Sequence, residues 1–534
     1  MTQADKHFSL RSPLLSPASP ASSLGFGLLL GAQQHEEAMG HEEAIGHEFD
    51  GGRAAEVVAG LRQGFGSGRT RTYQWRAVQL KAIARMIDEK EEDIAAAIYD
   101  DLAKPRMESF LHEIIVAKEA CLFALKNMKR WMKPKKVGTA ILTFPSSAKT
   151  VPEPLGVVLI ISAWNFPFLL SIEPVIGAIS AGNAVVLKPS EVAPATSSFF
   201  AKFLPDYVDN SCIRVVEGSV PETIALLEQK WDKILYTGNG RIGRAVMAAA
   251  SKHLTPVVLE LGGKCPVVVD SDVDINIVAK RIAAGKWGCN NGQACIAPDY
   301  IITTKSFAPK LLDALKVTLE KFYGKDPLGS PDLSHIVNSK HFMRLINLLD
   351  DVSGSIVYGG QKDEKHLKIA PTLLLDVPHD SSMMEEEIFG PFLPIVTVDD
   401  LEQSFDILNS KEKPLAAYLF TKNKNIEQKF VNTVSAGGML INDTILHFTN
   451  PRLPFGGVGE SGIGSYHGKF SFDAFSHKKP VLRRNFNFIG EIPMRYPPYT
   501  PQKQTVLTGL MTGNVIPFVL ALIKWPKGRQ HHKA

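Results

Sequence analysis

The stretch GVVLIISAWNFP at residues 156–167 decides the fold. Its apolar residues 157–161 are mostly β-branched and end at a loop, which is typical of a strand buried on both faces of a sheet. Similar short runs recur at 184–187, 213–216, 233–236 and 257–259. Strands of this kind, joined by crossover helices, predict an open α/β domain with a parallel sheet, whose ligand lies beyond the carboxyl ends of the strands.

A second α/β unit is expected after the first. Its strands are indicated near Pro266–Val269, Tyr300–Thr303, Ile356–Tyr358 and Pro394–Val398. Before the first sheet, apolar residues at helical spacing predict helices from Thr72, over Glu91–Ala103 and over Met107–Met132. The chain is therefore expected to have five parts: an extension (1–50), a first α/β domain (51–259), a second α/β domain (260–436), a bridging β segment (437–500) and a tail (501–534).

The composition is that of a globular protein, since 45% of the 534 residues are hydrophobic and 21% are charged. A wholly disordered, collagen-like or polytopic membrane chain is excluded. The net charge of +4 is too small over this length to supply the positive field that nucleic acids require, and we expect no nucleic-acid partner. Five cysteines without a CxxC pair indicate a reducing, intracellular environment.

The two ends of the chain each leave two interpretations open. Residues 1–34 are rich in serine and poor in acids, which suits a targeting peptide, for example for plastids, or a disordered arm. The repeat HEEAMG, HEEAIG at 35–46 is interpreted as a low-complexity linker. Thr505–Ile523 carries no charge and is just long enough to span a bilayer. It is either an anchor to a membrane such as the endoplasmic reticulum or a tail packed on the subunit surface; the expected location is otherwise cytoplasmic.

Three residues are candidates for chemistry. Cys295, in GQACIAPDY at 292–300, lies in a loop between turn-forming residues and is either a nucleophile or a small core residue. Glu260 ends the strand at 257–259, where its carboxylate is either a base or a structural acid. Asn165 follows the first strand, and its amide could donate to a developing oxyanion or shape a turn.

A nucleotide site is indicated by TGNGRIG at 237–243. Gly238, Gly240 and Gly243 fit the GxGxxG pattern between a strand and a helix. Because this loop follows the fourth strand of the sheet, we expect a phosphate or nucleotide nearby but not the ordinary dinucleotide pose. Lys188 and Glu191, in KPSE, close the second strand and could hydrogen-bond a ribose. The sequence has no GxxxxGK[ST] loop, which counts against an ATPase.

Taken together, these motifs resemble the aldehyde dehydrogenase superfamily, and its class 3 group with the plant members most of all. WNFP, KPSE, ELGGK, GQACIAPDY, EEIFGP at 386–391 and PFGGVGESG at 454–462 stand in the family order, and the resemblance covers about residues 51–499. It implies an open parallel-sheet dinucleotide-binding domain, a second α/β catalytic domain and a small bridging β segment. The chain departs from class 3 relatives by one extra residue, held in CNN at 289–291.

The resemblance also implies a role for each matching residue. Cys295 matches the nucleophile, Glu260 the general base and Asn165 the side-chain member of the oxyanion hole. The cofactor-binding matches are Lys188 and Glu191 for the adenosine ribose, Gly238 and Gly243 beside the pyrophosphate, and Glu387 and Phe389 for the nicotinamide ribose. No metal ion is expected.

The implied activity is the oxidation of medium-chain aliphatic or aromatic aldehydes to carboxylic acids through a cysteine thioester, by a homodimer. NAD is the expected cofactor, with some use of NADP, because a carboxylate at Glu191 repels a 2′-phosphate. Two alternatives stay open, namely an acylating dehydrogenase that passes the thioester to coenzyme A, and an inactive nucleotide-binding scaffold. Cys289 and Cys295, six residues apart, could also form a reversible disulfide.

Overall fold

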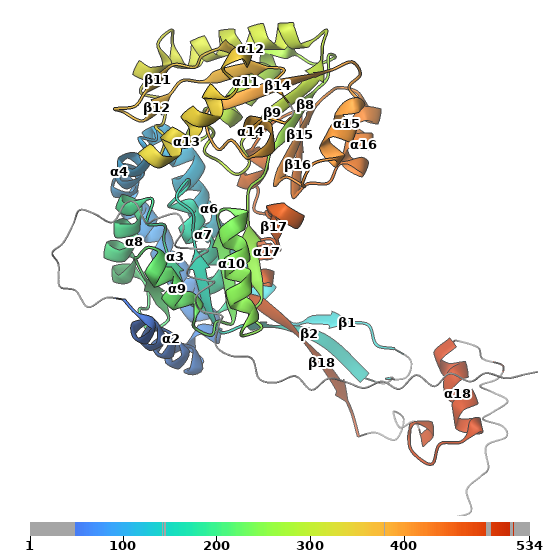
Figure 1. The fold of residues 1–534 in the computed structure, drawn as a ribbon. Coiled ribbons are helices and arrows are strands. Elements are labelled where there is room, and N and C mark those ends of the chain that lie inside the picture. The colour runs from blue at the N-terminus through green and yellow to red at the C-terminus, as the bar shows by residue number, and fades with distance from the viewer. Residues whose placement is uncertain are drawn as a thin grey trace, which may run out of the picture.

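The computed structural model describes residues 49–140, 143, 146–378, 380–486, 493–512 and 516. Two α/β units lie against each other, and a β arm projects from one of them (Figure 1). The predicted extension up to residue 48, with its histidine repeat, lies outside the described residues. So does the tail beyond residue 512, apart from residue 516.

Six strands form the first sheet, in the order β17-β7-β6-β3-β4-β5. Five of them are parallel: β3 (Val157–Ile161), β4 (Ala184–Lys188), β5 (Ile213–Val215), β6 (Lys233–Thr237) and β7 (Val257–Glu260). The short β17 (Gly462–Ile463) joins β7 in the antiparallel sense. Every residue of β3, β4 and β6 is buried, as expected for strands covered on both faces. The carboxyl ends of five strands therefore meet at one edge.

Helices cover this sheet. Its strands are connected by α7 (Leu169–Ala181), α8 (Pro194–Tyr207), α9 (Val220–Leu227) and α10 (Gly240–Ser251). The N-terminal helices pack on these connections: α2 (Gly51–Gly66), α3 (Tyr73–Glu89), α4 (Glu91–Leu102), α5 (Arg106–Ser109) and α6 (Ile115–Trp131). The single helix predicted over Met107–Met132 is interrupted, because a π turn, η2 (Phe110–Ile114), separates α5 from α6.

Seven strands form the second sheet, in the order β10-β13-β14-β9-β8-β15-β16. They are β8 (Pro266–Val269), β9 (Tyr300–Thr304), β10 (Ile356–Tyr358), β13 (Thr372–Leu375), β14 (Phe392–Val398), β15 (Ala416–Phe420) and β16 (Gly438–Ile441), and all but β10 are parallel. Its helices are α11 (Ile275–Lys286), α12 (Ala308–Tyr323), α13 (Ser339–Asp350), α14 (Ser382–Glu385), α15 (Gln403–Asn409) and α16 (Lys424–Thr433). A small hairpin pairs β11 (Lys362–Asp363) with β12 (Lys368–Ile369).

The projecting arm is a separate antiparallel sheet of β1 (Lys135–Val137), β2 (Ser146–Pro154) and β18 (Ser476–Arg484) (Figure 1). It joins segments from opposite ends of the sequence, since β2 precedes the first sheet and β18 follows α17 (Gly468–Ala474). Helix α18 (Pro501–Thr512) ends the described chain apart from residue 516. None of the helices in the described ranges is both long and apolar enough to cross a membrane.

The predicted fold class is confirmed, with two parallel sheets and a bridging β segment. The predicted boundary at 436 cuts the second sheet, because β16 lies beyond it and pairs with β15. Likewise β2, expected in the first domain, pairs with β18 in the arm. Sheets are completed by segments far apart in sequence, so a boundary drawn from a change in composition fell inside a sheet.

Candidate functional site

A cleft of about 400 Å³ is lined by residues from both α/β units. The first sheet contributes residues at or just after the ends of its strands, whereas the second contributes residues that precede its strands. Eight of the nine residues predicted for the site line this cleft: Asn165, Lys188, Glu191, Gly238, Glu260, Cys295, Glu387 and Phe389. Gly243 is not among the lining residues, because it packs against Leu261 inside α10, where a Cβ would lie 2.9 Å from Leu261 Cδ2.

Glu260 is the last residue of β7 and is 1% exposed. Burial raises the pKa of its carboxyl group to about 7, and contact with the Cys295 thiol opposes that rise. The Tyr466 hydroxyl donates a hydrogen bond to Oε2 at 3.4 Å, whereas Oε1 has no hydrogen-bond partner in the described part of the chain. This carboxyl group is partly ionised near neutral pH and has an oxygen free to accept a proton, as a general base requires.

Cys295 lies in the loop before β9 and is half-buried. The pKa of its thiol is raised well above the usual value, first by burial and then by the negative charge of Glu260. The backbone around it is held from two sides: the Cys265 thiol donates to the Cys295 carbonyl at 3.3 Å, and the Tyr418 hydroxyl donates to the Ile296 carbonyl at 2.6 Å. Because its pKa is raised, the thiol must lose its proton before the sulfur can attack.

The loop at 289–292, just before Cys295, takes an unusual path. Asn290 and Asn291 have φ values of 52° and 49°, and Gly292 has a φ of 81°. A side chain on Gly292 is excluded, because its Cβ would lie 2.2 Å from the Gly390 carbonyl oxygen. The two asparagine amides hold the loop by donating to distant backbone carbonyls, and Asn290 Nδ2 reaches the Asn165 carbonyl at 2.9 Å. Cys289 is buried, and all five cysteines are free thiols.

Asn165 lies between β3 and α7 and is 3% exposed, with its side chain on the cleft. Its backbone carbonyl accepts two hydrogen bonds, from Asn290 Nδ2 and from Lys104 Nζ at 3.2 Å. Two hydrogen bonds therefore fix the backbone of the residue that carries the amide. A fixed amide donor is what an oxyanion hole needs, because it stabilises charge without reorganising.

Three of the residues predicted to contact a ribose or phosphates, Lys188, Glu191 and Gly238, line the cleft at or beyond the ends of β4 and β6. Lys188 Nζ and Glu191 Oε2 form an ion pair of 2.5 Å, with the lysine buried and the carboxylate one-third exposed. Gly238 has a φ of 159°, and a Cβ there would lie 2.2 Å from the Tyr236 hydroxyl. Asn239 caps α10 by accepting a hydrogen bond from the Ile242 N–H. The N-terminus of α10 therefore opens onto the cleft, where backbone N–H groups favour phosphate.

The EEIFGP segment, which precedes β14, also lines the cleft. Burial raises the pKa of Glu387 to about 8, and the negative charge of Asp299 adds to that rise. Its carboxylate lies against Gly262, where a Cβ would be 2.1 Å from Glu387 Oε2. Phe389, with a φ of 49°, meets the Trp164 ring edge-on at 5.4 Å between ring centres. This one segment therefore gives the cleft both a carboxyl group and an aromatic ring.

Two further residues of this region were missed as site residues. Lys264 Nζ lies 2.6 Å from Asp299 Oδ2 and also donates to the carbonyls of Met383 and Glu386. Asp299 in turn accepts a hydrogen bond from the Ile388 N–H at 3.1 Å. This network joins the loops that carry Glu260, Cys295 and Glu387. The signal was present, because Lys264 and Asp299 belong to the ELGGK and GQACIAPDY motifs.

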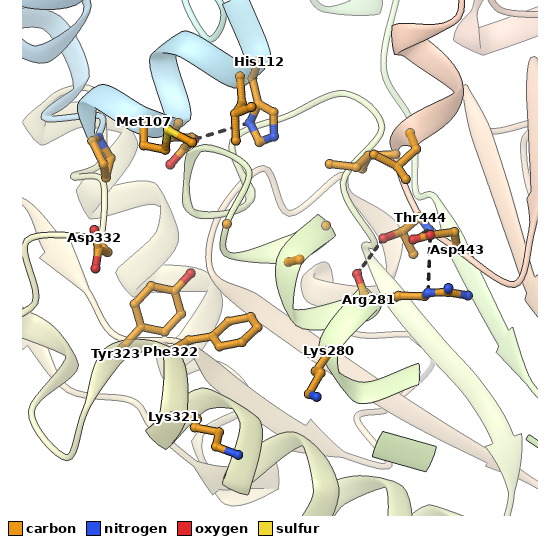
Figure 2. Close-up of a pocket in the computed structure, with 18 residues that line it drawn as sticks. Met107, His112, Lys280, Arg281, Lys321, Phe322, Tyr323, Asp332, Asp443 and Thr444 are labelled. Carbon is orange, nitrogen blue, oxygen red and sulfur yellow. Dashed lines mark hydrogen bonds and ion pairs between the residues drawn. The ribbon is translucent and has the colours of Figure 1, made fainter. Parts of the chain in front are cut away.

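A second cavity, of about 750 Å³, adjoins the segment around Gly288 (Figure 2). Its lining is largely apolar, with several charged groups: Met107, Leu111, Phe322, Tyr323, Ile445 and Leu446, together with Lys280, Arg281 and Lys321. Arg281 is paired with Asp443 at 3.4 Å. Glu108, also in the lining, accepts a hydrogen bond from the Asn290 N–H at 2.6 Å, so this cavity reaches the same loop as the cleft. Sequence reasoning could not find it, because its side chains are scattered through the chain.

Comparison with known proteins agrees with this geometry. The aldehyde dehydrogenase family model matches residues 43–481. The chain is 61% identical over 481 residues to aldehyde dehydrogenase family 3 member I1, chloroplastic, of Arabidopsis thaliana, an alignment that covers 90% of this chain and 87% of that relative.

Two solved structures are similar over most of the chain. The substrate-bound state of Staphylococcus aureus AldH has 40% identity and a TM-score of 0.82, and the match covers 85% of this chain and 98% of that one. An NAD-dependent aldehyde dehydrogenase from Sinorhizobium meliloti has 28% identity and a TM-score of 0.75, with 82% and 88% covered. The likeness therefore extends over both α/β units.

Proposed function

The chain belongs to the aldehyde dehydrogenase family, and on that premise we propose which of its residues carry the reaction. It oxidises aldehydes with NAD or NADP. Cys295 is the nucleophile, Glu260 the base and Asn165 the side-chain donor to the oxyanion. The observation that supports these roles best is the buried Glu260 carboxyl group, which contacts the Cys295 thiol and keeps one oxygen without a hydrogen-bond partner among the described residues.

In the first half of the reaction, the Cys295 thiol loses its proton to water in the cleft and the sulfur bonds to the aldehyde carbon. The carbonyl oxygen becomes an oxyanion that accepts a hydrogen bond from the Asn165 amide. The nicotinamide, when bound, supplies the acceptor for the hydride that leaves this carbon. Cys295 is then left as a thioester.

In the second half, a water molecule attacks the thioester carbon while Glu260 takes one of its protons. The carbon–sulfur bond breaks, the carboxylic acid leaves and the Cys295 sulfur is free again. A base buried beside the sulfur favours water as the acceptor of the acyl group. This arrangement argues against the alternative in which coenzyme A receives it.

The cleft suits a dinucleotide along its length. The Lys188–Glu191 pair would hold the adenosine ribose, Gly238 and the N-terminus of α10 the pyrophosphate, and Glu387 and Phe389 the nicotinamide ribose. NAD is favoured because the Glu191 carboxylate accepts hydrogen bonds from ribose hydroxyls and repels a 2′-phosphate. Since that carboxylate is one-third exposed, it can turn away and admit NADP.

For the aldehyde, we propose that its hydrocarbon part lies in the second cavity. The apolar side chains Met107, Leu111 and Phe322 would contact it, and the cavity adjoins the loop on which Asn290 supports Asn165. A volume of about 750 Å³ is ample for a medium-chain aliphatic or aromatic group. The apolar lining favours such groups over small, strongly hydrated aldehydes.

We further propose a homodimer built through the arm. Its strand β18 is mostly exposed, and the apolar Leu482 is 53% exposed on it. An exposed strand edge of this kind is a template for pairing with a second chain. Sedimentation of the purified protein should give the mass of a dimer, and a shift toward monomer on Leu482→Lys would place the arm in the interface.

For the compartment, we propose that residues 1–50 direct the chain to plastids, with the cytoplasm as the alternative. The serine-rich, acid-poor opening supports this, as does the chloroplastic relative. A fluorescent fusion of the full chain should enter plastids in plant cells, while one that begins at Gly51 should stay in the cytoplasm. Recovery of the full chain in carbonate-extracted membranes would favour the tail as an anchor instead.

The test of the activity is a product analysis with straight-chain and aromatic aldehydes and either cofactor. We expect one carboxylic acid for each reduced cofactor, without coenzyme A. A thioester product that appears only when coenzyme A is added would select the acylating alternative. Absence of cofactor reduction with every aldehyde would select the inactive scaffold.

A further inference from the structure

A fully buried ion pair lies beneath the loop that carries Asn165. Lys104 Nζ and Glu113 Oε1 are 2.6 Å apart, and both side chains have no exposed surface. Lys104 Nζ also donates to the Asn165 carbonyl at 3.2 Å and lies 4.1 Å from the centre of the Phe166 ring. The lysine therefore contacts two consecutive residues of this loop.

Glu113 holds the other end of the same loop. Its Oε2 accepts hydrogen bonds from the N–H groups of Phe168 at 2.9 Å and Leu169 at 3.2 Å. These groups belong to the start of α7, where N–H groups lack partners within the helix. One ion pair thus fixes the loop both before and after the Pro167 turn.

Two local irregularities of the backbone turn these side chains inward. Ala103, at the end of α4, has a φ of 46°, a left-handed conformation that alanine seldom adopts. It is followed at once by Lys104. Glu113 lies in the π turn η2, the extra residue of which rotates the side chains that follow relative to α5. Strained and π-helical positions of this kind cluster at functional sites.

A gain in stability does not by itself explain a buried ion pair, because apolar residues of similar size often make a protein interior equally stable. The contacts of this pair converge on one short loop. We infer that Lys104 and Glu113 are positioning residues that hold the Asn165 amide at the reacting carbonyl. The inference rests on the proposed role of Asn165 in the oxyanion hole.

The expected consequence is a slower acylation step without loss of cofactor binding. Lys104→Met removes one of the two donors to the Asn165 carbonyl and leaves Asn290 as the other. A small displacement of a catalytic group lowers rates by up to about 100-fold, so we expect the burst of reduced cofactor to slow by about 10- to 100-fold. The Michaelis constant for NAD should stay within about twofold, since the Lys188–Glu191 pair is untouched.

The experiment is a double-mutant cycle of Lys104→Met and Asn165→Ala, read as the burst rate in rapid mixing. If Lys104 acts through the amide, Lys104→Met slows the wild type but has no further effect on Asn165→Ala. Equal slowing in both backgrounds overturns the inference, because the effect then does not pass through Asn165. Should Lys104→Met fail to fold, Lys104→Met/Glu113→Gln, which removes both charges of the pair, takes its place.

Arg76→Met is the matched control. Arg76 is also a buried cation that donates to backbone carbonyls, but one of its partners is Ser180 at the far end of α7. Arg76→Met should lower the melting temperature as much as Lys104→Met does, while its burst rate stays within about twofold of the wild-type rate. A burst slowed equally by both variants would mean general loosening and would overturn the inference. If Asn165→Ala keeps the burst rate of the wild type, the proposed oxyanion role of Asn165 is contradicted. The failure then lies with the proposed function, not with the positioning by Lys104.

Discussion

The two parallel sheets contribute to the cleft from opposite edges. In the first sheet, Asn165, Lys188, Gly238 and Glu260 lie at or just beyond the carboxyl ends of β3, β4, β6 and β7. In the second sheet, Cys295 precedes β9, while Glu387 and Phe389 precede β14. The carboxyl edge of one sheet therefore faces the amino edge of the other.

This difference separates the proposed nucleophile from the proposed base and amide. The first sheet follows the general rule that ligands bind beyond the carboxyl ends of parallel strands, and it carries the proposed nucleotide contacts, base and amide. The second sheet carries the proposed nucleophile at an edge where that rule predicts no ligand. Catalysis thus depends on how the two edges are held together. Substitutions at the two edges should impair different steps of the reaction.

The largest effect is expected on the second side, from Cys295→Ala. Without the sulfur no covalent adduct forms, so both the burst of reduced cofactor and steady turnover should fall by at least about 10⁴-fold. Stopped-flow absorbance with NAD and aldehyde measures both phases. A burst that survives this substitution would move the nucleophile to another residue.

On the first side, Glu260→Gln should act later in the reaction. Loss of a general base costs about 10²- to 10⁴-fold, and we expect that loss in steady turnover while a burst of reduced cofactor remains. The same stopped-flow trace gives both values. If burst and turnover decline together, Glu260 is needed to deprotonate the Cys295 thiol as well as water.

Gly262→Ala tests the contact between the two sides. Its Cβ would lie 2.1 Å from Glu387 Oε2, so the carboxylate must move, and we expect kcat to fall by about 10- to 100-fold. Gly60→Ala is the matched control, because nothing lies within 4 Å of its Cβ in α2. That control should keep full activity and raise the melting temperature slightly. Full activity in Gly262→Ala would show that the contact does not matter.

The smallest effect is the pH dependence of turnover. Glu260 acts as a base only when deprotonated, and burial raises its pKa to about 7. Turnover should therefore rise with pH and level off above about 7, and below that it should drop about tenfold for each pH unit. Initial rates across this range check the expectation. A rate that is level from pH 5 to pH 9 would exclude Glu260 as the group that limits turnover.

The sequence predicted the first sheet well, because β3 and β4 are uninterrupted apolar runs with β-branched residues. In the second sheet it missed β13, β15 and β16. The last two begin with Ala416 and Gly438, residues with a low preference for strands. Asn165 and Glu260 could be found from their places after strands. Cys295 was a candidate from its loop alone, with a core residue as the alternative. Glu387 and Phe389, which precede a strand, were assigned only through the family resemblance.

Other parts of the site had no pattern that sequence reasoning could use. Lys104 and Glu113 form hydrogen bonds with a backbone carbonyl and backbone N–H groups of the loop. Because nearly every residue has such groups, the sequence of the loop does not reveal these contacts. The left-handed conformation of Asn290 and Asn291 was not predicted, because it depends on carbonyls more than 40 positions away. Long-range contacts of this kind arise from the fold rather than from local propensity.

The central claim is that the groups from the two edges meet at one sulfur atom. The most direct measurement is mass spectrometry of Glu260→Gln after brief mixing with NAD and an aldehyde, followed by acid quenching and digestion. We expect the acyl group on the peptide that contains Cys295, at close to one per chain, because water can no longer remove it. An acyl group on Cys265, Cys289 or any other residue, or an unmodified Cys295 peptide after a full burst, would contradict the account.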